Sequence, residues 1–182
     1  FDNLTEENIY VLDSPILTNS QLKKFKKFFS KKVKVIDCTF DIERSLKERI
    51  ELIRKEAETA VREGSTCLVL SDKNISNQKA SIPSILTVGA VHSHLVKHGL
   101  RGYCSLNVEC SDAMDTHSFA ILIGVGATTV NPYLAIDSIY QRFEKKLFGK
   151  SDFQTCVNKF KKSIDAGLLK IMSKMGISVI SS

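Results

Sequence analysis

Residues 42–70, IERSLKERIELIRKEAETAVREGSTCLVL, decide the fold, because a long amphipathic helix is followed directly by a buried strand. Apolar side chains recur at three- and four-residue intervals from Leu46 to Val61, which predicts a helix over 42–63. Gly64 stands where such a helix takes its C-terminal cap. Thr66–Leu70 is an apolar run, as expected for a strand covered on both faces. This order of elements is typical of a parallel α/β sheet.

Three further strands are predicted outside this unit. Val33–Cys38 alternates and is β-branched, and Tyr103–Val108 alternates apolar with polar residues. Ile9–Leu12 is a short apolar run that ends at a turn sequence, Asp13-Ser14-Pro15. The polar stretch Asp72–Ser81 has no periodicity and predicts a loop.

Helices are predicted between these strands. Thr18 or Asn19 can cap the first helix, and His117–Ile123 fits either a helix or a buried strand. Strands separated by helices favour parallel pairing with right-handed crossovers, so the predicted fold class is α/β, a parallel sheet flanked by helices. The other predicted helices run from Pro83 to Gly99, from Asn131-Pro132 to Phe143, and from Asp152 to about Lys174.

The composition is that of an ordinary globular protein, with 182 residues, 43% of them hydrophobic and 25% charged. The longest apolar stretches, such as Phe119–Val125, fall far short of the roughly 20 residues that cross a bilayer, so no membrane span is expected. The five cysteines are odd in number and show no CxxC spacing. We therefore expect free thiols and a reducing compartment.

The net charge of +6 is local, because seven lysines and no acidic residue lie between Lys23 and Lys34. Such a cluster can bind nucleic acid, but the aromatic residues Phe25, Phe28 and Phe29 fall at the spacing of a helix core. We interpret the lysines as a solvated helix face and expect no nucleic-acid partner. The alternative hypothesis is a free-standing α/β binding module that docks an acidic partner through Lys23–Lys34.

Two local patterns have a functional and a structural interpretation. His94 and His98 are four residues apart on a predicted helix and can share a metal ion, with Cys104 and Cys110 as the remaining ligands. Packed or surface histidines are the favoured interpretation, and no cysteine is marked as having a lowered pKa. The sequence GVGATT at 124–129 resembles a dinucleotide fingerprint, but Asn131-Pro132 interrupts the helix that it needs, which favours a tight, closely packed turn.

The stretch GLLKIMSKMGISVISS at 167–182 passes from a helix through Met175-Gly176 into an apolar, β-branched run, which predicts a strand. A glycine between a helix and a strand is normally a C-cap. Lys170 and Lys174 beside it leave a second interpretation open, namely contact with a flavin or an anionic substrate.

Several longer motifs together resemble the central region of glutamate synthase, running into the start of its flavin-binding barrel. The resemblance covers essentially the whole chain, in the same order. It implies a central α/β domain at 1–150, then a helix and the first strand of a truncated FMN-binding β/α barrel at 151–182. The motifs are IYVLDSPIL at 9–17, EAETAVREGSTCLVLSDK at 56–73, SIPSILTVGAVHSHLVKHGLR at 81–101, HSFAILIGVGATTVNPYLAID at 117–137 and GLLKIMSKMGIS at 167–178.

The resemblance implies that the chain is part of a larger enzyme that makes two L-glutamate from L-glutamine and 2-oxoglutarate. The ending ISVISS at 177–182 resembles the ferredoxin-dependent forms, which implies ferredoxin as partner and electron donor. The cofactors that this implies are FMN and a 3Fe-4S cluster. The implied location is the plastid stroma, with the bacterial cytoplasm as alternative. This piece is expected to link the amidotransferase and FMN domains, to help form the ammonia tunnel, and to be inactive alone.

Few functional residues of that family map onto this chain. The cysteines match no cluster-ligand motif and Phe1 is not the catalytic cysteine, so no catalytic residue and no metal ligand is carried over. The segment that matches the first barrel strand and its approach implies contacts to the flavin. The cofactor-binding residues that the resemblance implies are Ser173, Lys174, Met175 and Gly176.

Overall fold

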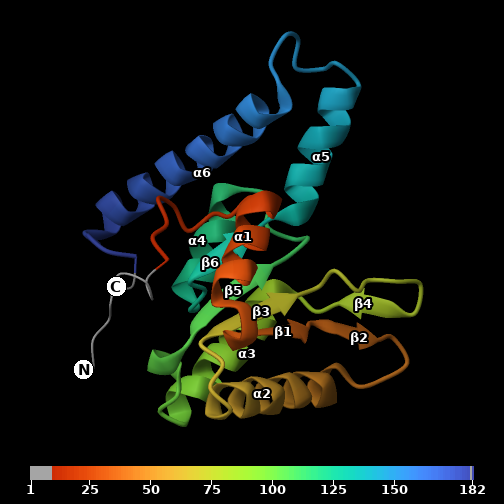
Figure 1. The fold of residues 1–182 in the computed structure, drawn as a ribbon, viewed down its shortest axis with the longest axis vertical. Helices are drawn as coiled ribbons and strands as arrows, with labels where there is room; N and C mark the ends of the chain where they lie inside the picture. Colours follow the sequence, from red (N-terminus) through yellow and green to blue (C-terminus); the bar gives the residue numbers. More distant parts are fainter. Residues whose placement is uncertain (1–9, 181) are drawn as a thin grey trace.

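A four-stranded parallel sheet, in the order β1-β3-β5-β6, forms the centre of the chain (Figure 1). The computed structural model describes residues 10–180 and 182. Beyond β6, Ile16 forms a parallel bridge with Val130 and extends this edge of the sheet. The prediction of a parallel α/β sheet is confirmed. The strands are β1 (Val33–Asp37), β3 (Cys67–Ser71), β5 (Ser105–Glu109) and β6 (Thr129–Asn131).

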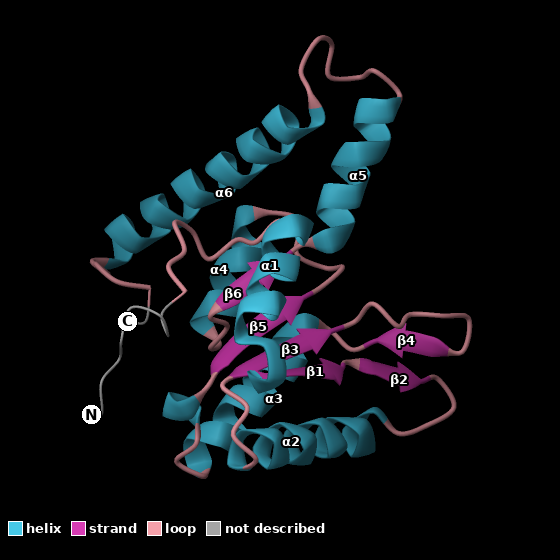
Figure 2. Cartoon of the chain, in the orientation of Figure 1, coloured by secondary structure: helices cyan, strands magenta, loops and turns pink. Residues whose placement is uncertain are grey.

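Helices cover both faces of the sheet (Figure 2). The face that carries Leu68 and Leu70 of β3 packs in one apolar core with side chains of four helices. The opposite face carries Cys67 and Val69, which pack with Leu22 of α1. This double coverage explains why the sequence of β3 is apolar on both faces. The helices are α1 (Asn19–Phe29) on the second face, and α2 (Leu46–Arg62), α3 (Ser84–Lys97), α4 (Thr116–Gly124) and α6 (Phe153–Met175) on the first.

Side-chain caps set the starts of α1, α2, α4 and α6. Thr18, one of the two predicted caps, forms a capping box with Gln21 at the start of α1. Asp152 accepts a hydrogen bond from the backbone N–H of Thr155 at the start of α6. The ambiguous segment at 117–123 lies within α4. Two short 3₁₀ turns, η2 (Ser30–Lys32) and η3 (Arg101–Tyr103), lead into β1 and β5.

The last two helices form a hairpin that extends away from the sheet, with α5 (Tyr133–Glu144) leading outward and α6 returning (Figure 1). Hydrogen bonds hold α6 against the segment before α1. Lys161 Nζ lies 3.0 Å from Asp13 Oδ1, and Ser14 Oγ donates to Asp165 Oδ1 at 2.6 Å. No helix in the described part of the chain is both long and apolar enough to cross a membrane.

Three sequence predictions need correction. Residues 10–12 form no strand, because Tyr10 packs edge-on against Phe25 and Phe28 of α1 instead of pairing with a neighbouring strand; Ile9 lies outside the described residues. The predicted loop at 72–81 contains β4 (Lys79–Ser81), which pairs antiparallel with β2 (Thr39–Asp41) in a ribbon beside the sheet.

The third correction concerns the end of the chain. The strand expected after Gly176 is not confirmed, because residues 177–180 are irregular and pair with no strand among the described residues. A strand requires hydrogen bonds to a neighbour. The truncated barrel strand therefore stays a prediction about a longer protein.

Candidate functional site at the carboxyl edge of the sheet

Buried polar side chains gather where the parallel strands end. Asp72 follows β3, Glu109 ends β5 and Asn131 ends β6, and their exposed fractions are 2%, 6% and 1%. In open α/β sheets functional groups usually lie at the carboxyl edge, because the carboxyl ends of all the parallel strands meet there. This edge is therefore the first candidate site in the structure.

Glu109 is held by two lysines from different elements. Lys26 of α1 lies 3.1 Å from Oε2, and Lys73 lies 2.9 Å from Oε1. Burial by itself raises the pKa of Glu109, but the hydrogen bonds and charges of Lys73 and Lys26 outweigh it and leave the pKa below its usual value. Both carboxylate oxygens are engaged, so Glu109 joins α1 to the loop after β3.

Asp72 connects the end of β4 with the loop after β5 at the same edge. Its Oδ2 accepts hydrogen bonds from Ser81 Oγ at 3.0 Å and from Ser111 Oγ at 2.6 Å. Its buried Oδ1 has no hydrogen-bond partner among the described residues. Tyr133 at the start of α5 lies nearby, and burial, followed by the Asp72 carboxylate, raises the pKa of its phenol. This carboxylate and tyrosine offer polar contacts but no paired nucleophile and base.

Asn131 fixes the segment before α1 to β6. Its Nδ2 donates to the backbone oxygen of Leu17 at 2.8 Å and to Asn19 Oδ1 at 3.0 Å. Its Oδ1 is buried and, like Asp72 Oδ1, has no partner among residues 10–180. The edge thus holds two buried acceptor oxygens that a hydrogen-bond donor from outside these residues would satisfy.

The implied flavin-binding residues lie far along α6. Ser173, Lys174 and Met175 form its last turn, and Gly176 is its C-cap in the left-handed conformation, with φ 68°. All four residues are exposed. The structure therefore places them together on one accessible helix end, and their contact with a flavin stays a prediction.

The five cysteines are all free and buried. Burial raises the pKa of the Cys38 thiol to about 12 and that of Cys67 to about 11. Burial also raises the pKa of Cys104 and Cys110. A thiol must ionise to act as a nucleophile or metal ligand, so these four are structural.

The predicted histidine pair forms, but without the cysteines. The His94 and His98 rings lie side by side on α3, with centroids 4.2 Å apart. Their third neighbour is Glu58 of α2, and the candidate ligand atoms of the three residues lie within 4.8 Å of one another. Glu58 was not predicted from the sequence, because only the packing of α2 against α3 brings it there.

The glycine-rich turn at 124–129 is a closely packed turn, as its favoured interpretation predicted. Gly126 has φ 117°, and a Cβ at this position would lie 2.2 Å from His92 Nδ1. Arg101 holds the turn by donating to Gly126 O at 2.8 Å and to His92 Nδ1 at 3.1 Å. The turn therefore needs glycine for its backbone conformation and for space.

The lysine cluster is mostly solvated, as interpreted from the sequence. Lys26 pairs with Glu109, and Lys34 pairs with Glu56 on α2 at 3.1 Å. Phe25 is buried, whereas Phe28 is 44% exposed and packs edge-on against Tyr10. The exposed lysines of the cluster are Lys23, Lys24, Lys27, Lys31 and Lys32.

Comparison with known proteins gives a match along nearly the whole chain. The family model described as glutamate synthase central domain matches residues 2–182. The NADPH-type glutamate synthase large chain of Azospirillum brasilense is 45% identical over 98% of this chain and 12% of its own length. The corresponding Bacillus subtilis large chain is 40% identical, over 94% of this chain and 11% of its own.

Ferredoxin-dependent relatives match as well. The ferredoxin-dependent glutamate synthase of Pyropia yezoensis is 38% identical over 94% of this chain and 12% of its own length. The chain thus spans about 12% of the length of the relatives that it matches. A solved structure of a fructose-1,6-biphosphate aldolase from Coccidioides immitis has a TM-score of 0.36 and 15% identity, over 78% of this chain and 56% of that one.

Proposed function

The chain belongs to the glutamate synthase central domain family, and from this premise we propose that it links the amidotransferase and FMN domains of a glutamate synthase large chain. The observation that carries the proposal is the family match over residues 2–182, supported by 45% identity to the Azospirillum large chain. The reaction proposed for the complete protein is the formation of two L-glutamate from L-glutamine and 2-oxoglutarate.

The role of this domain in that reaction is architectural. The thiols of Cys38, Cys67, Cys104 and Cys110 are buried, and their pKa values are raised, so they supply no nucleophile. Both oxygens of Glu109 are engaged by lysines. We therefore propose a domain that is inactive alone and that contributes part of the wall of the ammonia path between the two catalytic sites.

The end of α6 is the part of this chain proposed to approach FMN, which supplies electron transfer when bound. The residues fit such an approach, because a Cβ at Gly176 would meet no atom of the described residues within 4 Å, and Ser173, Lys174 and Met175 are exposed in the described part of the chain. Lys174 supplies a positive charge that favours an anionic group. Ser173 and Met175 complete the surface on the same turn. The ligands of the 3Fe-4S cluster are proposed to lie outside this chain.

For the electron donor we propose reduced ferredoxin, which the ISVISS ending at 177–182 favours. NADPH is the second candidate, because the Azospirillum relative carries NADPH in its name and is 45% identical, whereas the ferredoxin-dependent relative from Pyropia is 38% identical. The cell compartment that we propose depends on the electron donor. We propose the plastid stroma for a ferredoxin-dependent enzyme and the bacterial cytoplasm for an NADPH-dependent one.

The test is a glutamate-forming assay on the purified complete large chain with glutamine and 2-oxoglutarate. We expect turnover with photoreduced ferredoxin and none with residues 1–182 alone. If the enzyme instead turns over with NADPH, in the presence of the protein that transfers electrons from NADPH, then NADPH replaces ferredoxin as the proposed electron donor. The proposed role of the domain in the family is unchanged by that result. Absence of glutamine-dependent glutamate with either donor would overturn the proposed function.

A further inference from the structure

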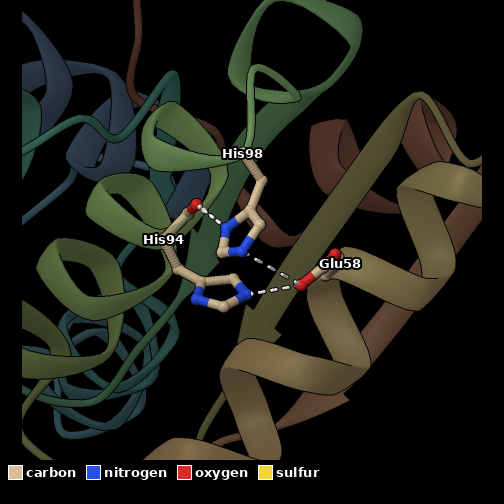
Figure 3. A group of neighbouring side chains, drawn as sticks. All are labelled: Glu58, His94 and His98. Carbon is tan, nitrogen blue, oxygen red and sulfur yellow. Dashed lines mark hydrogen bonds and ion pairs between the residues drawn. The ribbon is translucent and has the colours of Figure 1, made fainter.

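Glu58, His94 and His98 form a compact group between α2 and the C-terminal end of α3, shown in Figure 3. Glu58 Oε2 lies 2.7 Å from His94 Nε2 and 4.0 Å from His98 Nε2. Around a tetrahedral zinc ion with bonds of about 2.0–2.2 Å, neighbouring donor atoms are about 3.3–3.5 Å apart. The two observed distances bracket this value, and the donor atoms of the two histidines lie within 4.8 Å of each other, so side-chain rotations would bring all three donors onto one ion.

His98 is already held in the form that a metal requires. Its Nδ1 lies 2.8 Å from the backbone oxygen of His94 (Figure 3). A carbonyl oxygen only accepts hydrogen bonds, so Nδ1 carries the proton. In the neutral ring this leaves the lone pair on Nε2, which is the nitrogen that faces Glu58. A backbone carbonyl that orients the ring in this way is the usual support of a metal-binding histidine.

The two carboxylate oxygens of Glu58 face different neighbours. Arg62 binds Oε1 through Nε at 2.9 Å and Nη2 at 2.8 Å, which leaves Oε2 toward the histidines. The hydrogen bond from His94, followed by that from Arg62, lowers the pKa of the Glu58 carboxyl, so it is ionised at neutral pH. The Arg62 charge opposes a cation but also fixes the carboxylate in the orientation that the ion needs.

We propose that Glu58, His94 and His98 bind a divalent transition-metal ion of the zinc type. Two imidazoles and one carboxylate suit zinc, and a water molecule completes its four ligands. On binding, the ion replaces the hydrogen bond between His94 Nε2 and Glu58. The neutral imidazole of His94 then carries its single proton on Nδ1, which leaves the lone pair of Nε2 for the ion. The ion would tie α2 to the C-terminal end of α3.

The group is open enough to exchange an ion with solvent. The exposed fractions of the three side chains are 21% for Glu58, 18% for His94 and 34% for His98. Water therefore reaches the position between the donors. The competing interpretation is an ion pair between helices that binds no metal, and it predicts no effect of these residues on metal affinity.

The experiment is isothermal titration with zinc of the complete large chain, freed of loosely bound metal by a mild chelator that leaves the iron–sulfur cluster in place, for the wild type, Glu58→Gln and His98→Ala. We expect one binding event in the wild type that weakens by at least about tenfold in each variant, since loss of even a supporting group costs this much. His117→Ala is the matched control, because it removes an imidazole of α4 outside the group, and its titration is expected to equal the wild type.

A crystal soaked in zinc supplies the second readout. We expect an anomalous peak at the zinc edge about 2.0–2.2 Å from the Nε2 atoms of both histidines in the wild type, and its loss in His98→Ala. Unchanged titration in both variants, or a peak elsewhere only, would overturn the proposal. Glutamate-forming activity and flavin absorbance show that each variant is folded, and a failed proposal leaves the family role untouched.

Discussion

Glu109 illustrates how much one buried charge depends on its partners. Only 7% of its side chain is exposed, and both oxygens are bound by lysines from segments far apart in sequence. A buried carboxylate without such partners would take up a proton. Lys26 and Lys73 therefore keep Glu109 charged, and Glu109 in turn fixes α1 over the sheet.

Replacing Glu109 by Gln is expected to destabilise the β5 region by about 1–3 kcal/mol at pH 7, since charged hydrogen bonds are lost. The lowered pKa means that this stabilisation is present above the ordinary glutamate pKa of 4.5 and is lost as the pH falls through the lower folded value. Amide hydrogen exchange of β5 in the complete chain, corrected for intrinsic rates, measures the difference between wild type and Glu109→Gln at pH 7 and pH 4.

Glu56→Gln is the control for that measurement. It removes the surface pair with Lys34, whose side chains are 34% and 43% exposed, and should cost at most about 1 kcal/mol. If the difference in β5 stability between the wild type and Glu109→Gln stays constant from pH 7 to pH 4, the assigned role of Glu109 is contradicted.

Side chains that act locally were predictable from the sequence, whereas those that act across elements were not. Thr18 as a cap and Gly126 as a tight turn depend on a few neighbouring residues. Glu58 meets His94 only because α2 and α3 pack together, 36 positions apart in sequence. Such a contact leaves no periodic signal in a single sequence.

Among the elements, α6 depends on close packing against α4. Gly167 lies in its middle, and a Cβ there would approach Thr116 Cγ2 to 2.5 Å and Oγ1 to 2.7 Å. The absent side chain lets the helix come near the start of α4. The hydrogen bonds of Ser14 and Lys161 then hold it at this distance.

Gly167→Ala is expected to loosen α6 by about 1–3 kcal/mol, although alanine is the better helix former, because the added methyl group overfills the contact. Faster amide exchange along α6 in the complete chain is the measure. The double variant Gly167→Ala, Thr116→Ala restores the space and should regain most of the protection. Equal loss in single and double variants would show that the contact with Thr116 is not the cause.

At this scale the long elements were predictable and the short ones were not. The 17 residues of α2 carry several repeats of the helical pattern, and the buried run of β3 fits only a covered strand. β2 and β4 have three residues each, too few for an alternating pattern to be distinguished from a loop. The two strands pair because β2 follows β1 and β4 follows β3 along the chain, and β1 and β3 are neighbours in the sheet.

For the whole molecule, the main alternative function rests on the lysine cluster. Changing Lys23, Lys24, Lys27 and Lys31 to Gln removes four exposed charges and spares Lys26, which pairs with Glu109. We expect the complete enzyme to keep its glutamate-forming rate within about twofold, because solvated charges contribute little to stability. A rate or partner binding that fell more than tenfold, while Lys97→Gln left both unchanged, would favour the acidic-partner hypothesis.

The family and the parallel architecture could be predicted at this scale, because motifs and helix–strand alternation run along the whole chain. The position of the segment before β1 could not. Its Leu17 N–H donates to Val130 O at 2.9 Å, and Val130 N–H donates to Pro15 O at 2.8 Å, a pairing between distant segments. No local pattern distinguishes this edge from any other apolar stretch.

That edge has a consequence for the order of events during synthesis. β1, β3, β5 and β6 are made in their spatial order, so each new strand can dock on the one made before it. The backbone oxygen of Leu17 instead accepts a hydrogen bond from Asn131, which is synthesised 114 positions later. At about 5–20 residues per second, the ribosome takes about 6–23 s to supply that partner. The segment around Leu17 is therefore the last to hydrogen-bond to the edge of the sheet, although Leu17 and Leu22 can already pack on Cys67 and Val69 of β3.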